Sequence, residues 1–186
     1  MNTTKKLLVA ALSIGVIAFL SSCQSIPGNA TAVQNFNAEK YMGTWYEIAR
    51  IDFKHERNMD NVSAQYSLQP SGMVKVLNSG FDYKKNEWEK AEGKAKFRGE
   101  KHIAELKVSF FGPFYSGYNV IALDEDYRYA LVAGKDLDYL WILSRSTTIP
   151  EAVKTNYLRI AQDAGYDTSR LTWVTHDRDD NPYLNK

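Results

Sequence analysis

Short segments rich in β-branched and aromatic residues alternate with turn signals from residue 43 to residue 145. Such residues fit a pleated, half-buried strand, whereas clusters of Pro, Gly, Asn and Asp break it. This spacing favours an all-antiparallel β-barrel or sandwich over alternating β and α units. The eight predicted strands cover residues 43–51, 61–69, 73–82, 87–97, 103–111, 117–123, 127–133 and 138–145.

One amphipathic helix is predicted after the strands. Thr148-Ile149-Pro150-Glu151 has the pattern of a capping box, in which the Thr148 hydroxyl accepts an amide and Glu151 reaches back. Gly165 ends the helical pattern. A closed barrel has no free sheet edge but still needs apolar cover outside, so we expect this C-terminal helix to pack on the barrel. Its apolar stripe consists of Val153, Tyr157, Ile160, Ala161 and Ala164.

The N-terminus has the features of an export signal. Lys5 and Lys6 precede an apolar run over residues 7–20, which is typical of a signal peptide and short for a membrane-spanning helix. Leu20-Ser21-Ser22-Cys23 resembles the lipobox of bacterial lipoproteins. That resemblance implies cleavage before Cys23 and attachment of lipid to its sulfur. Cys23 is the only cysteine, which excludes an intramolecular disulfide.

The chain is expected to contain four segments. Residues 1–22 form the signal peptide, 23–35 a lipidated tether, 36–175 the barrel with its helix, and 176–186 a charged, flexible tail. A single helical turn opened by Asn35 or Asn37 is expected within residues 36–42, and a last short strand within residues 171–175. The chain has 23 Lys and Arg against 22 Asp and Glu. This near-neutral charge, without a basic cluster, argues against nucleic acid as a partner.

Three motifs resemble those of the lipocalins, in the same order along the chain. The first, Gly43-Thr44-Trp45, lies on the first predicted strand. The second is Asp126-Tyr127 with Tyr129, and the third is Leu143-Ser144-Arg145 at the end of the eighth strand. Residues 107–115 and 118–123 are similar to the bacterial and apolipoprotein-D-like branch, whose bacterial members are outer-membrane lipoproteins. The chain lacks the disulfides that many lipocalins carry.

This resemblance implies an eight-stranded, up-and-down antiparallel barrel with a structural floor. Gly43 and Trp45 would lie at that floor, with Arg145 stacked across the indole of Trp45. The resemblance also implies a Gram-negative protein held at the periplasmic face of the outer membrane by acylated Cys23. It further suggests a homodimer.

Alternation along the strands, anchored on the family pattern, predicts which side chains point into the barrel. On the fifth strand, Glu105, Lys107 and Ser109 alternate with apolar residues, so a shift of one residue would put charge inside. The predicted cavity contacts are Glu47, Ala49, Ala64, Tyr66, Val76, Asn78, Leu106, Val108, Phe110, Tyr118, Val120, Tyr139 and Trp141. The same alternation turns Leu68, Val74, Ala122 and Leu143 inward.

These residues fit either a ligand cavity or a solid barrel filled by side chains. The resemblance favours the cavity and implies a fatty acid or a lysophospholipid as its cargo. The aromatic cluster at residues 110–115 is either a rim that touches a membrane or a partner, or an ordinarily packed loop.

The sequence gives little support to catalysis. His55, His102 and His176 show no metal-ligand spacing, and no phosphate loop or nucleophile elbow is present. We therefore predict a cofactor-free binding protein, not an enzyme, that stores or transports lipid in the cell envelope. Two alternatives stay open: an envelope scaffold acting through its outer surface, and a lipid-modifying enzyme using Glu47 with a tyrosine.

Overall fold

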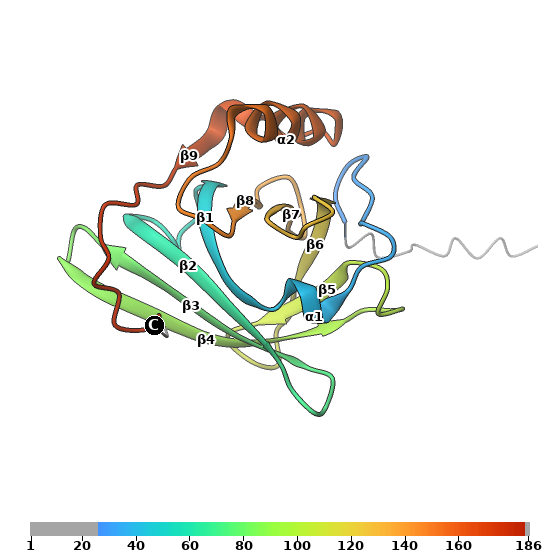
Figure 1. Cartoon of the computed structure of the whole chain (residues 1–186), viewed down its shortest axis with the longest axis horizontal. Coiled ribbons are helices and arrows are strands. Elements are labelled where there is room, and N and C mark those ends of the chain that lie inside the picture. Colours follow the sequence, from blue (N-terminus) through green and yellow to red (C-terminus); the bar gives the residue numbers. More distant parts are fainter. Residues whose placement is uncertain (1–25, 185–186) are drawn as a thin grey trace, which may run out of the picture.

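Each barrel strand pairs antiparallel with the next one in sequence, and β1 pairs with both β8 and β2, which closes the barrel (Figure 1). The computed structural model describes residues 26–184, and within them the predicted eight-stranded antiparallel barrel is confirmed. The barrel strands are β1 (Gly43–Ile51), β2 (Met59–Leu68), β3 (Val74–Asp82), β4 (Glu87–Phe97), β5 (Glu105–Ser109), β6 (Ser116–Leu123), β7 (Tyr129–Ala133) and β8 (Leu140–Ser144). The predicted signal peptide and Cys23 lie outside the described residues.

The up-and-down order gives the barrel two different ends. Helix α1 (Ala38–Tyr41) precedes β1 and lies at the end that we call the floor. Its cap is Asn37, whose side chain accepts a hydrogen bond from the Lys40 amide over 3.0 Å. The loops at residues 52–58, 83–86, 110–115 and 134–139 lie at the opposite end, which we call the mouth.

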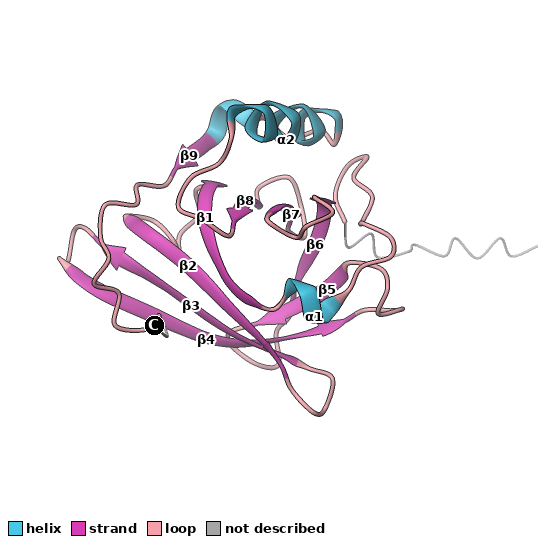
Figure 2. Ribbon diagram, in the orientation of Figure 1, coloured by secondary structure: helices cyan, strands magenta, loops and turns pink. Residues whose placement is uncertain are grey.

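Helix α2 (Glu151–Asp163) lies on the outside of the barrel, above β1, β7 and β8 (Figure 2). Its predicted apolar stripe is confirmed, since Tyr157 and Ala161 are buried against the sheet. The predicted capping box is wrong. The helix begins only at Glu151, with Pro150 at the cap and no side-chain cap bond. Thr148 instead offers its carbonyl to the hydroxyl of Ser144, which draws this segment toward the barrel.

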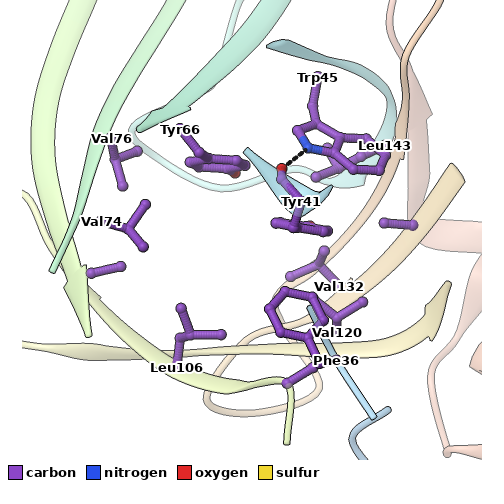
Figure 3. Close-up of a cluster of buried hydrophobic side chains, with 13 residues drawn as sticks. Phe36, Tyr41, Trp45, Tyr66, Val74, Val76, Leu106, Val120, Val132 and Leu143 are labelled. Atoms are coloured by element: carbon purple, nitrogen blue, oxygen red, sulfur yellow. Dashed lines mark hydrogen bonds between the residues drawn. The ribbon is translucent and has the colours of Figure 1, made fainter. Parts of the chain in front are cut away.

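Two apolar clusters cover the two faces of the sheet. The inner cluster includes Trp45, Tyr66 and Leu106 (Figure 3). The outer cluster includes Ile142 and Tyr157 and is buried beneath α2. Along β1, β7 and β8, both faces of the sheet are therefore apolar. The inner face lies inside the barrel, and α2 covers the outer face.

A β-bulge in β1 corrects one predicted inward residue. Glu47 pairs with Leu143 and Ala49 with Ile142, so Ile48 is the extra residue between them. The bulge reverses the alternation, and Ala49 lies in the outer cluster instead of the cavity. Arg50, which strict alternation would turn outward, pairs with Trp141 and is buried.

The same happens on β6. The register shifts between Val120 and Ala122, and Ala122 packs with the outer cluster although it was predicted to point inward. Leu68 keeps the inward side of β2, because it pairs with the cavity residue Val74, but it is 40% exposed at the strand end. Strict alternation thus fails at the two bulges.

The C-terminal segment fills the gap where β1 and β2 separate. Strand β9 (Leu171–Trp173) pairs with β1, and the Val174 amide donates to the Ile48 carbonyl over 3.0 Å. Further along, the Asn61 amide donates to the Thr175 carbonyl over 2.8 Å, and the Asn181 side chain is buried. The expectation of a flexible tail from residue 176 therefore does not match these contacts, which extend along the barrel (Figure 1).

The segment before α1 is also more ordered than a tether. The Val33 amide donates to the Val120 carbonyl over 2.9 Å, and the Ala104 amide donates to the Val33 carbonyl over 3.0 Å. Ile26 and Ala30 pack against the outer cluster. The apolar side chains of this segment pack on the barrel. The segment expected as a tether, residues 23–35, therefore contacts the barrel from Ile26 onward.

Candidate functional site: the barrel cavity

A cavity of about 540 Å³ runs through the inside of the barrel toward the mouth. This volume falls in the range of roughly 300–1,000 Å³ that is usual for sites of small molecules. Most of its lining is apolar or aromatic. The predicted contacts that line it are Glu47, Ala64, Tyr66, Val76, Asn78, Leu106, Val108, Phe110, Tyr118, Tyr139 and Trp141, and Val74 and Leu143 line it as well.

Two of the predicted contacts do not line the cavity. Ala49 faces the helix because of the bulge in β1. Val120 points inward but is packed behind the cavity surface, next to Val132 in the inner cluster (Figure 3).

At the floor, Phe36, Tyr41 and Met42 line the cavity, and Trp45, which is 0% exposed, packs behind Tyr41. Its indole nitrogen donates to the carbonyl of Tyr41 over 2.8 Å (Figure 3). The guanidinium carbon of Arg145 lies 3.9 Å from the centre of the indole ring, which is a cation–π contact. This is the stacking that the resemblance implied for the two residues.

The hydrogen bonds of Arg145 join the three sequence motifs. Its Nη1 donates to the carbonyl of Thr44 over 2.7 Å, and its Nε donates to the carbonyl of Tyr127 over 3.1 Å. Nη2 donates to the carbonyl of Met42 over 2.8 Å. A planar guanidinium can serve all these carbonyls at once, which is why arginine suits this position.

A buried charged cluster lies farther up the barrel, and sequence reasoning missed it. Arg50 contacts the carboxylate of Glu47 over 2.9 Å, and both side chains are almost fully buried. Arg50 also donates to the carbonyls of Glu56 and Met59 over 2.7 and 3.2 Å. Only the bulge brings Arg50 inside, and a bulge has no clear signal in the sequence.

Glu56 belongs to the same cluster and lines the cavity. Its carboxyl oxygen Oε2 accepts a hydrogen bond from the indole nitrogen of Trp141 over 3.0 Å. Burial, reinforced by the charge of Glu47, raises the pKa of Glu56 to about 8. Burial also raises the pKa of Glu47, although Arg50 opposes this shift. Glu56 is therefore mostly uncharged at neutral pH.

Three tyrosine hydroxyls form a second polar group nearer the floor. The hydroxyl of Tyr118 lies 2.8 Å from that of Tyr41 and 3.0 Å from that of Tyr66. All three residues line the cavity. The cavity thus has a charged cluster above, a hydroxyl cluster below, and apolar walls around them.

Aromatic side chains surround the mouth. Phe111 and Phe114 are 71% and 79% exposed, so these two residues are not packed as in an ordinary loop. Phe110 points inward, and Phe111 and Phe114 line the cavity at its mouth. Phe53 packs edge-on against Trp141, with ring centres 5.8 Å apart.

Within residues 26–184, no group of three or more His, Cys, Asp or Glu side chains could hold a metal ion. None of the helices in this part of the chain is long and apolar enough to cross a membrane.

The chain belongs to the lipocalin family, whose lipocalin-like domain matches residues 36–176. It is 51% identical over 166 residues to the outer membrane lipoprotein Blc of Citrobacter freundii, a match that covers 89% of this chain and 94% of the relative. The protein of the same name from Escherichia coli K12 is 50% identical over 167 residues, covering 90% and 94%. Apolipoprotein D of Rattus norvegicus is 32% identical over 163 residues, covering 82% of each chain.

Solved structures support the fold. Insecticyanin from the tobacco hornworm Manduca sexta superposes with a TM-score of 0.65 at 20% identity, covering 82% of this chain and 88% of that one. Lobster apocrustacyanin A1 gives the same TM-score at 17% identity, covering 82% and 91%. The bacterial relatives are named outer membrane lipoproteins, which supports a lipid-anchored location at the outer membrane for this chain.

Proposed function

We propose that this lipocalin is a carrier that binds a fatty acid or a lysophospholipid in its barrel, for storage or transport in the cell envelope. The observation that carries the proposal is the cavity of about 540 Å³, lined mainly by apolar side chains. An acyl chain fits such a lining because each buried methylene contributes about 0.8 kcal/mol. Binding costs offset part of this gain.

The two ends of the cavity suggest the orientation of the lipid. The acyl chain enters first and lies along Val76, Leu106 and Val108. The polar head remains near the charged cluster, where Glu56 lines the cavity and offers a partner for an anionic or zwitterionic group. This orientation leaves the head close to the mouth, from which the lipid is released.

The mechanism is passive and reversible. Acylated Cys23 would hold the barrel at the periplasmic face of the outer membrane, where several acyl chains on one residue give firm anchoring. The lipid enters and leaves chemically unchanged, so the protein acts as a binding protein. The proposal extends to a homodimer, on the likeness to the bacterial branch alone.

The test is calorimetric titration of the soluble domain with octadecanoic acid and with a lysophospholipid of the same chain length. We expect one lipid per barrel. Ala64→Phe places a ring in the cavity. The ring takes the room of two methylene groups of the acyl chain, and the loss of their burial weakens binding by about fifteenfold. Val108→Phe is a second occluding variant. Ala152→Phe is the matched control, because Ala152 lies on the exposed face of α2.

Circular dichroism and thermal melting establish that each variant is folded. Equal lipid affinity in the folded occluding variants and in the control would contradict the proposal, as would a failure of both lipids to bind the wild-type protein.

An envelope scaffold is the second candidate, and the exposed rings of Phe111 and Phe114 favour it. A scaffold predicts that Phe111→Ser and Phe114→Ser abolish capture of a partner, whereas Ala64→Phe inside the cavity leaves that capture unchanged. The carrier proposal predicts instead that occluding the cavity weakens lipid binding.

A further inference from the structure

The three tyrosines of the hydroxyl cluster come from separate elements of the fold. Tyr41 lies on α1, Tyr66 on β2 and Tyr118 on β6. The rings of Tyr41 and Tyr66 are stacked with their centres 5.8 Å apart (Figure 3). Tyr118 reaches between their hydroxyls from the other side of the barrel, over 2.8 and 3.0 Å.

A count of protons shows that this cluster always has one donor to spare. Each tyrosine hydroxyl carries one proton, and each hydrogen bond between two hydroxyls uses one. The three hydroxyls make two such contacts, one from Tyr118 to Tyr41 and one from Tyr118 to Tyr66. Two protons are used, and the third has no acceptor within the cluster.

Each hydroxyl keeps its own proton, but which of the three O–H groups is left unpaired can change. Burial raises the pKa of Tyr41, Tyr66 and Tyr118 above the ordinary tyrosine value, so each hydroxyl remains neutral. Rotation of the hydroxyls reverses the chain of bonds and presents the free O–H at either end or at the centre. The cluster is therefore an adaptable hydrogen-bond donor.

The surroundings of the cluster are apolar. Phe36, Val74 and Leu106 belong to the same inner cluster as the tyrosines. A donor left without an acceptor in such surroundings is costly, and an oxygen from a bound molecule would relieve that cost.

The hydroxyl cluster lies nearer the floor than the position proposed for the lipid head. Tyr66 pairs with Gly43, which lies four residues before Glu47 on β1. About 13 Å of strand therefore lies between the two levels. An oxygen that reaches the tyrosines is carried within the acyl chain, away from the head group.

We propose that the Tyr41–Tyr118–Tyr66 cluster is a second polar subsite, which selects acyl chains bearing a hydrogen-bond-accepting oxygen such as a ketone, an epoxide or a hydroxyl. This inference rests on the proposed function, because it concerns which acyl chains the carrier prefers. It extends the cargo from plain to oxygenated lipid.

The first test uses the wild-type protein with octadecanoic acid and a series of its oxo derivatives, each with the ketone at a different carbon. A ketone that meets the tyrosines keeps the affinity of the parent acid or exceeds it. A ketone elsewhere in the apolar cavity loses its hydration without a partner and binds about tenfold more weakly. Affinity is therefore expected to peak at one ketone position in the interior of the chain. A profile without a peak would overturn the inference.

The second test removes the donor. Because any shorter chain of hydroxyls still has one spare proton, all three must be changed, in the triple variant Tyr41→Phe, Tyr66→Phe and Tyr118→Phe. The control is Tyr157→Phe with Tyr166→Phe, which removes two buried hydroxyls outside the cavity. We expect the triple variant to lose the peak and bind the best oxo acid about tenfold more weakly, while octadecanoic acid still binds.

The outcomes separate the two proposals. If the triple variant keeps the peak, or if both proteins bind all the acids equally, the spare proton serves bound water only and the subsite is refuted. If octadecanoic acid itself fails to bind the wild-type protein, the carrier function is refuted first. Should the triple variant not fold, the position scan on the wild-type protein decides alone.

Discussion

Raising the pH from 6 to 9 should weaken the binding of an anionic lipid, because Glu56 loses its proton in this range. The carboxyl of Glu56 is buried beside Glu47 and lines the cavity, and its pKa is raised to about 8. Below this pKa the neutral group can donate a hydrogen bond to the lipid head. Above it, a second negative charge faces that head.

The size of the effect follows from the pKa. Nearly all of the protein has a protonated Glu56 at pH 6, and about one tenth at pH 9. If the lipid binds only the protonated form, affinity falls by about twofold at pH 8 and about tenfold at pH 9. The free energy of unfolding changes with pH in the same direction. The contribution of Glu56 is fully present below its unfolded pKa near 4.5 and is lost as the pH rises through about 8.

The assay is fluorescence displacement with a long-chain alkyl sulfonate, whose charge does not change over this range. Glu56→Gln keeps a neutral side chain at every pH, so its affinity should stay constant while that of the wild-type protein falls. The same fall in both proteins, or a wild-type affinity that rises with pH, would refute the role given to Glu56.

Three further changes test other parts of the structure. Arg145→Ala should lower the free energy of unfolding by about 2–4 kcal/mol, and Arg145→Lys should not restore it, because an ammonium cannot both stack and serve the Thr44 carbonyl; a full rescue in urea denaturation would count against this. Arg50→Met should cost about 3–5 kcal/mol in the same assay by leaving Glu47 buried and unpaired, and adding Glu47→Gln should recover much of the loss; no recovery would contradict the pairing. Replacing residues 1–23 with a leader that is cleaved without lipidation should move the protein from the membrane to the soluble periplasmic fraction, and continued sedimentation with membranes would refute the anchor.

The regular parts of the fold were accessible from the sequence because they obey a simple period. Leu106 and Val108 on β5, and Phe110 directly after it, alternate with polar residues, and the structure places all three on the cavity. Tyr157 and Ala161 on α2 follow the helical period, and both are buried between α2 and the barrel. In such segments the apolar pattern determines the face, since the opposite choice would bury charge.

The remaining features depend on departures from the period. One extra residue at Ile48 turns Ala49 away from the cavity and buries Arg50 beside Glu47, behind the cavity surface. The position of Glu56 depends on the loop after β1, which no periodicity describes. The segment after residue 176 looked like a free tail because it is charged. Its contacts exist because β1 and β2 separate and leave backbone groups that the tail can pair.

Crystals of the protein grown with octadecanoic acid that carries bromine on its terminal carbon would test the central claim most directly. The account predicts one anomalous bromine peak per barrel, in the lower half of the cavity above Trp45 and near Val74 and Leu106, with the carboxylate toward Glu56. A bromine peak at the mouth beside Phe111 and Phe114, or a barrel interior without lipid at saturating concentration, would contradict it.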